Sequence, residues 1–313
     1  GIAGYALGQA APLFLLAWLG PRLRERMPDG CALHEYAQHR YGPRLRRFTL
    51  ALVLFYLFVF LAAEITAIAL AVRLLADVPL AWTAIVVTAG TVAYTGYGGL
   101  RASIFTDRIQ FAMILPLLAA VFLGALARLG GPAAAFHRAA AASPQLFSWR
   151  HAAGIEFGFT LIIAITAANL FHQGFWQRVY AGRDTPTVRR TYAYSGLIVI
   201  PIVFAAGLFG FMALDQPLAS GQSSVAFFAL AARTFPPALT VTVLVLALAL
   251  VMSSADTLLN GMSSAIVSEL AKMLAVIDAQ HLTIQFIASV HRNRVVPFIF
   301  TDARMLRFDV QIR

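Results

Sequence analysis

Residues 48–72 read FTLALVLFYLFVFLAAEITAIALAV, with Glu64 as the one charged side chain among these 25 residues. An α-helix rises about 1.5 Å per residue, so about 20 apolar residues cross the roughly 30 Å hydrocarbon core of a bilayer. The stretch therefore predicts a transmembrane helix that carries an acid near its middle.

The same pattern recurs along the whole chain. Runs of this kind predict seven spanning helices, at roughly residues 1–20, 48–72, 80–96, 108–127, 153–171, 191–214 and 238–268. The third run is the shortest, and the last is long enough to project beyond the membrane. Hydrophobic residues make up 60% and charged residues 12% of the 313 residues, whereas a soluble domain is about 25% charged. We therefore predict an all-α membrane protein.

The ends of the chain set the expected domain organisation. Residues 1–272 are expected to form one transmembrane domain, and residues 273–313 a cytoplasmic tail whose pattern favours neither helix nor strand. The chain opens at Gly1 inside an apolar stretch, with no basic segment or cleavage site before it, so we interpret the start as a truncation without a signal peptide.

The arginines predict how the helices are oriented. Thirteen arginines lie in or at the edge of three alternate loops, 21–47, 97–107 and 172–190, and the other loops hold five. Because loops rich in Lys and Arg face the cytoplasm, the first helix is expected to run inwards through the cell membrane, which would be the inner membrane of a bacterium. This distribution also argues against nucleic acid as the partner of the +10 net charge.

Polar residues inside spanning helices are costly, so each is a candidate for function. Glu64 is either a contact for an ion or solute, or an acid hydrogen-bonded only for packing. In residues 251–270, VMSSADTLLNGMSSAIVSEL, a polar face follows helical spacing through Ser253, Thr257, Asn260 and Ser264. Its oxygens suit a hard cation such as Na⁺, but small polar residues also let helices pack closely.

Two further segments carry polar residues at the expected membrane boundary. Asp107 is predicted to lie in the first turn of a helix, with Thr106 as its N-cap, after a flexible glycine-rich turn. Asn169, His172 and Gln173 end the fifth predicted helix. No second His or Cys stands at ligand spacing from His172, which argues against a metal site.

Three motifs together resemble the sodium:solute symporter family. Residues 94–110, YTGYGGLRASIFTDRIQ, are similar to its Tyr-Thr-x-x-Gly-Gly signature, which ends in Thr-Asp-x-x-Gln. Residues 172–184, HQGFWQRVYAGRD, and the Met-Ser-Ser-Ala-Asp of residues 252–256 resemble two later elements, in the family's order. Residues 33–42, LHEYAQHRYG, are similar as well. The resemblance covers roughly residues 1–272.

The resemblance implies part of the leucine-transporter arrangement, an inverted repeat of five plus five helices with its ion and solute sites near the membrane midplane. It implies that Ser253 and Ser254 bind Na⁺ through their hydroxyls and Leu250 through its carbonyl, and that Asp107 takes part in sodium coupling. It also implies that Gln173 contacts the solute or a gate, and we expect the same role for Asn169 and Glu64. The family's first core helix and everything after its eighth are not matched.

The resulting hypothesis is a non-enzymatic secondary transporter that couples Na⁺ influx to the uptake of a small polar solute. Its expected partners are Na⁺, the solute and the lipid bilayer, with no cofactor beyond the coupling ion. One alternative is the sensory module of a transporter-like signalling protein, and another is an inactive truncated fragment. A membrane prenyltransferase would need paired Asp-rich motifs, which the sequence lacks.

Overall fold

The computed structural model describes residues 1–291 except 29, 31, 149–150 and 215–222. Within these residues the chain is helical and forms no strand, which confirms the predicted fold class. The elements in chain order are α1 (Ile2–Arg26), α2 (Leu33–Tyr41), α3 (Pro43–Ala76), α4 (Leu80–Arg128), α5 (Pro132–Ala142), the 3-10 helix η1 (Pro144–Phe147), α6 (Ala152–Leu170), α7 (Gln173–Ala181), α8 (Thr185–Met212), the 3-10 helix η2 (Ser223–Val225), α9 (Ala226–Thr234) and α10 (Pro237–His291).

The chain divides into two compact units, Gly1–Ala265 and Ile266–Arg313. In the second unit the described residues are the continuation of α10 as far as His291, so residues 273–291 of the expected tail are helical. The rest of that tail lies outside the described residues.

Among the described residues, six helical segments are long and apolar enough to cross a membrane: Ile2–Arg26, Pro43–Ala76, Ser103–Arg128, Ala152–Leu170, Thr185–Met212 and Pro237–Leu270. They contain six of the seven predicted spans. The remaining predicted span, residues 80–96, is helical but forms the first part of α4 and does not meet the same criterion of length and hydropathy. Large apolar side chains cover the outside of the bundle, and Phe55 is 68% and Ile163 70% exposed. Such a surface is stable against lipid rather than water.

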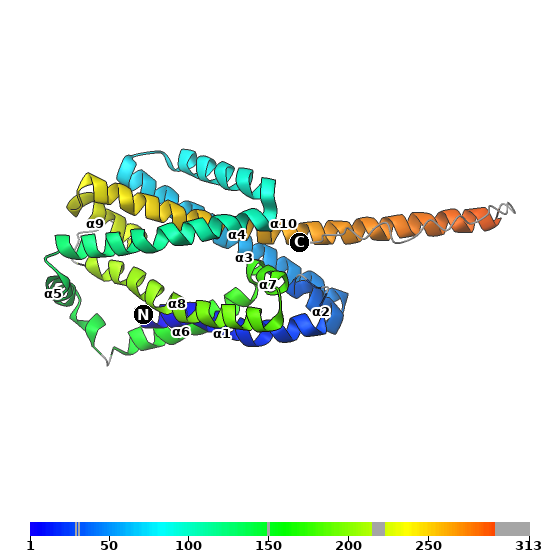
Figure 1. Ribbon diagram of the computed structural model, residues 1–313, viewed down its shortest axis with the longest axis horizontal. Coiled ribbons are helices and arrows are strands. Elements are labelled where there is room, and N and C mark those ends of the chain that lie inside the picture. The colour runs from blue at the N-terminus through cyan, green and yellow to red at the C-terminus, as the bar shows by residue number, and fades with distance from the viewer. Residues whose placement is uncertain (29, 31, 149–150, 215–222, 292–313) are drawn as a thin grey trace. The chain divides into compact units, whose positions relative to one another are not determined.

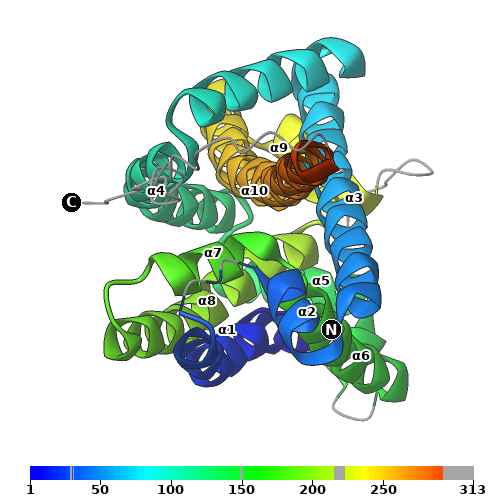
Figure 2. The ribbon, with the colours of Figure 1, turned by 90° about the vertical axis from the view of Figure 1, so that its right-hand side faces the viewer.

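The spanning helices form two groups, which Figure 2 shows end-on, with α1, α6 and α8 on one side and α3, α4 and the first-unit part of α10 on the other. Small residues allow the closest approach within the first group. A Cβ on Gly4 would overlap the backbone of Gly158, and one on Gly8 would lie 3.3 Å from the Cα of Ile162. Because the residue number rises by four on both helices from one contact to the next, α1 and α6 run in the same direction.

Two of the arginine-rich loops lie at the same end of the bundle. The guanidinium of Arg24, in the last turn of α1, donates hydrogen bonds to the carbonyls of Val179 and Arg183, each at 3.5 Å. The segments 21–47 and 172–190 therefore adjoin one another, as the charge pattern predicts for loops on one side of the membrane.

Helix α4 turns back on itself near its middle, as Figure 1 shows. The hydroxyls of Tyr94 and Thr106 bind the same carboxylate oxygen of Asp256, at 3.2 and 3.1 Å, so they lie within about 6.3 Å of each other. A straight helix would separate the two Cα atoms by about 18 Å. The chain therefore reverses in the segment 97–107 that was predicted to join two spans, but the prediction of a flexible loop was wrong, because the backbone there is helical.

Candidate functional site

A polar network centred on Asp107 joins α4, α7 and α10. One carboxylate oxygen of Asp107 accepts a 2.6 Å hydrogen bond from Arg178 of α7, and the other accepts a 2.9 Å bond from the hydroxyl of Ser253 in α10. The same Arg178 nitrogen lies 3.0 Å from the hydroxyl of Thr257. Charge-assisted bonds of this length are among the stronger contacts in proteins. The network therefore ties together three helices that are far apart in sequence.

The break between α6 and α7 brings Arg178 to this position. Helix α6 ends at Leu170, and its last carbonyl accepts a 2.7 Å hydrogen bond from the indole of Trp176. Trp176 is buried, so it anchors α7 under the end of α6. Arg178 also donates to the carbonyl of Gly174 one turn earlier, which fixes its side chain along α7. The guanidinium is thereby held towards α4 and α10.

A second acid, Asp256, is fully buried and holds the bend of α4. Its carboxylate accepts hydrogen bonds of 3.0–3.2 Å from the hydroxyls of Tyr94, Ser103 and Thr106 in α4, and from that of Thr257 beside it. Four donors satisfy most of the acceptor sites of a carboxylate. We therefore interpret Asp256 as a structural acid that links the two halves of α4 to α10.

The predicted helix start at Asp107 was wrong. Helix α4 continues through this position without interruption. Thr106 does not cap a helix, because its hydroxyl donates to the carbonyl of Ser103 and to Asp256. With no free helix end to stabilise, the carboxylate of Asp107 has its ion pair and its serine contact as its partners.

Leu250, Ser253 and Ser254, three of the four residues expected to bind Na⁺, lie about one turn apart on α10, and the fourth, Asp107, contacts this turn from α4. Ser253 contacts Asp107, and the hydroxyl of Ser254 donates to the carbonyl of Leu250 at 3.1 Å. Hydroxyl, carbonyl and carboxylate oxygens are the ligands that hard cations prefer. Farther along the predicted polar face, Ser264 bonds to its own helix through the carbonyl of Gly261, at 3.2 Å.

Glu64 lies on the face of α3 that packs towards α10. Leu57 and Ile68, one or two turns away on the same face, belong to clusters that contain Leu258 and Val251 of α10. Leu57 shares a cluster with Leu258, and Ile68 shares one with Val251, so α3 and α10 run antiparallel. Glu64 lies between these two contacts and is therefore level with Ser254. Within the described residues its carboxylate has no hydrogen-bond or ion-pair partner. The acid therefore faces the bundle.

The two other predicted solute contacts lie around the break before α7. The amide of Asn169 donates to the carbonyl of Ile165 in its own helix, at 3.0 Å. Gln173 is fully buried and packs against Gly261 of α10. Gln173 thus lies at the contact of α7 with α10, whereas the hydrogen bond of Asn169 stays within α6.

His172 is buried between aromatic rings. It stacks on Phe175, with ring centroids 4.7 Å apart, and meets the edge of Tyr56. Burial, and secondly the nearby charge of Arg178, lower the pKa of His172 to about 4. The imidazole is therefore neutral at physiological pH, and no group of three or more acidic, His or Cys side chains in the described chain could hold a metal.

Two residues of the polar network, Arg178 and Asp256, were not predicted as site residues. Arg178 contributed to the prediction only as one of the loop charges that orient the helices in the membrane, although it directly follows Gln177 in a family motif. Asp256 lies in the polar stretch of α10, but not on the polar helical face that was predicted from residue spacing. A useful signal was the combination of one arginine and two acids in otherwise apolar helices, because buried charges require partners.

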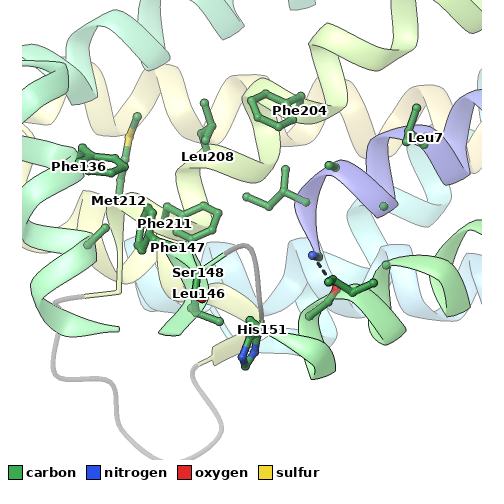
Figure 3. Close-up of a pocket in the computed structure, with 18 of the residues that line it drawn as sticks. Leu7, Phe136, Leu146, Phe147, Ser148, His151, Phe204, Leu208, Phe211 and Met212 are labelled. Atoms are coloured by element: carbon green, nitrogen blue, oxygen red, sulfur yellow. Dashed lines mark hydrogen bonds between the residues drawn. The ribbon is translucent and has the colours of Figure 1, made fainter. Parts of the chain in front are cut away.

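A large cavity lies elsewhere, between the starts of α1 and α6, the end of α8, α5 and η1. Its volume is about 910 Å³, and Figure 3 shows Phe136, Phe147, Phe204 and Phe211 around it. Its described lining includes neither an acid nor an arginine. This apolar space is unsuited to a cation and is separate from the network around Asp107.

Comparison with known proteins agrees with this architecture. The family model for the sodium:solute symporter family matches residues 1–290. The chain is 27% identical over 271 residues to the spermidine transporter DUR31 of Candida albicans, an alignment that covers 85% of this chain and 50% of that protein. The chain thus spans about half the length of this relative. The match over most of the chain, together with its apolar helices, shows that the protein is a multi-pass membrane protein that belongs to the sodium:solute symporter family.

Proposed function

We propose that this chain forms part of a secondary active transporter, in which Na⁺ entry drives the uptake of a small polar solute by alternating access. The observation that supports it best is the network in which Asp107 contacts Ser253, next to the Ser254–Leu250 pair. Membership of a family of solute symporters supports the coarser role of solute transport. No step of this mechanism alters the solute covalently.

The ion site would use the oxygens of one turn of α10 and the carboxylate of α4. Both serine hydroxyls donate to acceptors, but each can rotate and turn a lone pair towards a cation. Arg178 neutralises one oxygen of Asp107, so the site carries less than a full negative charge. We propose that this balance keeps Na⁺ binding weak enough to be reversible, since affinity rises with the charge of the ligands.

The test is Na⁺-dependent uptake by the full-length protein in proteoliposomes. Ser253→Ala combined with Ser254→Ala should raise the Na⁺ concentration for half-maximal uptake far more than either change alone. Ser264→Ala is the matched control, because it removes a serine hydroxyl from the same helix outside the turn that holds Ser253 and Ser254. Unchanged sodium dependence in the double variant, at equal protein content, would leave these serines with a packing role.

We propose a cationic amine as the solute class. The relative described as a spermidine transporter shares 27% identity, and Glu64 offers a bundle-facing carboxylate at the level of the proposed ion site. A carboxylate in a low-dielectric bundle would attract an ammonium group strongly. Uptake of labelled spermidine should exceed that of labelled proline, and Glu64→Gln should raise the KM for spermidine. Equal KM values in the variant and the parent would exclude Glu64 from recognition.

A further inference from the structure

The ends of α1 and α8 next to the arginine-rich loops form a groove that the proposed transport mechanism does not use. The two helices are antiparallel, because Gly196 packs on Phe14 and Gly207 packs on Ile2. Two hollows of about 410 and 390 Å³ lie between their outer faces and share three lining residues, Trp18, Arg189 and Arg190. Shared residues make the two hollows one continuous groove along the helices.

The groove changes character along its length. Phe14 and Tyr194 line the hollow that lies deeper in the spanning segments, and Arg22 and Glu25 line the hollow nearer the helix ends. Trp18 stands at the junction and is 52% exposed. Aromatic rings at the boundary between lipid and water, with arginines beyond them, match the layers of a bilayer surface.

The basic end of the groove is prearranged. Arg22 donates a 2.6 Å hydrogen bond to the carbonyl of Trp18, and its guanidinium carbon lies 4.2 Å from the centre of the Trp18 ring. Within the described part of the chain, Arg189 and Arg190 are not paired with any carboxylate. Glu25 is the one acid of the lining, so three arginines leave the groove with a net charge of +2.

We propose that this groove binds the phosphate headgroup of an anionic phospholipid in the cytoplasmic leaflet. The guanidinium groups would donate to the phosphate oxygens, and Phe14 and Tyr194 would pack along the upper part of an acyl chain. Anionic lipids are concentrated in this leaflet, where each basic side chain contributes to attraction. A soluble phosphate would use only the basic end and leave the aromatic end uncovered.

The experiment measures quenching of tryptophan fluorescence in the full chain, reconstituted in phosphatidylcholine vesicles that contain increasing fractions of brominated phosphatidylglycerol. Saturable quenching by this lipid, beyond the quenching that the same fraction of brominated phosphatidylcholine gives, is expected, and Trp18→Phe should remove this excess. Arg189→Gln combined with Arg190→Gln should weaken the apparent affinity about thirtyfold, since each charge contributes close to a factor of five. Arg44→Gln with Arg47→Gln is the matched control, because these exposed arginines are outside the groove.

Equal weakening in the control pair would mean that general surface charge attracts the lipid, and would overturn the proposal. Displacement by millimolar glycerol phosphate would assign the groove to a soluble anion instead. Unchanged selectivity in the Arg189 and Arg190 variant would also refute it, provided that the thermal unfolding midpoint is kept. The readout is lipid binding, so it is independent of sodium-driven uptake.

Discussion

Removing either partner of the Arg178–Asp107 ion pair should destabilise the fold, and removing both should cost less than the sum. A pair on the surface contributes at most about 1 kcal/mol, and breaking a buried pair costs about 3–5 kcal/mol. These side chains are 27% and 28% exposed and 2.6 Å apart. We therefore expect Asp107→Asn and Arg178→Gln each to cost about 2 kcal/mol. The double variant should fall short of the sum by about 1 kcal/mol or more, because neither charge is left alone.

Thermal or denaturant unfolding in one detergent, with all variants at the same protein concentration, measures these differences. Arg183→Gln is the control, because Arg183 belongs to an ion pair in the same loop with side chains 86% and 41% exposed. Its cost should stay within about 0.5 kcal/mol. Strictly additive costs for Asp107 and Arg178 would refute the coupling inferred from the geometry.

Three further outcomes are expected, each measured by thermal unfolding in detergent. Asp256→Ala leaves three α4 hydroxyls without their shared acceptor and should cost about 3 kcal/mol or more; a cost below 1 kcal/mol would contradict the role given to this acid. Gly4→Val places a side chain in the backbone of α6 and should destabilise, whereas Gly90→Ala, with open space around it, should be neutral or stabilising. Stability should fall as pH drops from about 6.5 towards 4, because the unfolded His172 takes up a proton that the buried one, with its pKa of about 4, does not. That fall should be smaller in His172→Gln.

The spanning segments were predictable because their signal is local. A run such as residues 48–72 must be helical in lipid, where no water can satisfy the backbone. The N-cap of α8, which was not predicted, is also a local contact, since the carboxylate of Asp184 accepts the 2.8 Å hydrogen bond of Thr187 N–H. Hydrogen bonds from the Thr187 hydroxyl and then from the Thr187 N–H lower the pKa of Asp184 to about 2.

The centre of the site was less predictable because its contacts join distant segments. Ser253 lies 146 residues from Asp107, and Asp107 lies 71 residues from Arg178. Periodicity shows which side of a helix is polar, but not which helix will face it. For the same reason the bend of α4 was mistaken for a loop, since glycines in sequence do not reveal that a distant acid holds both halves.

The link between α4 and Asp256 has a consequence for biosynthesis. The hydroxyls of Tyr94, Ser103 and Thr106 emerge from the ribosome 150–162 residues before their acceptor. At about 5–20 residues per second, that interval lasts roughly 8–30 s. During this time the two halves of α4 lie in the translocation machinery or the bilayer without the carboxylate that bonds to both. The hydrogen bonds that hold the turned-back conformation of α4 can therefore form only after the Asp256 segment of α10 has been synthesised.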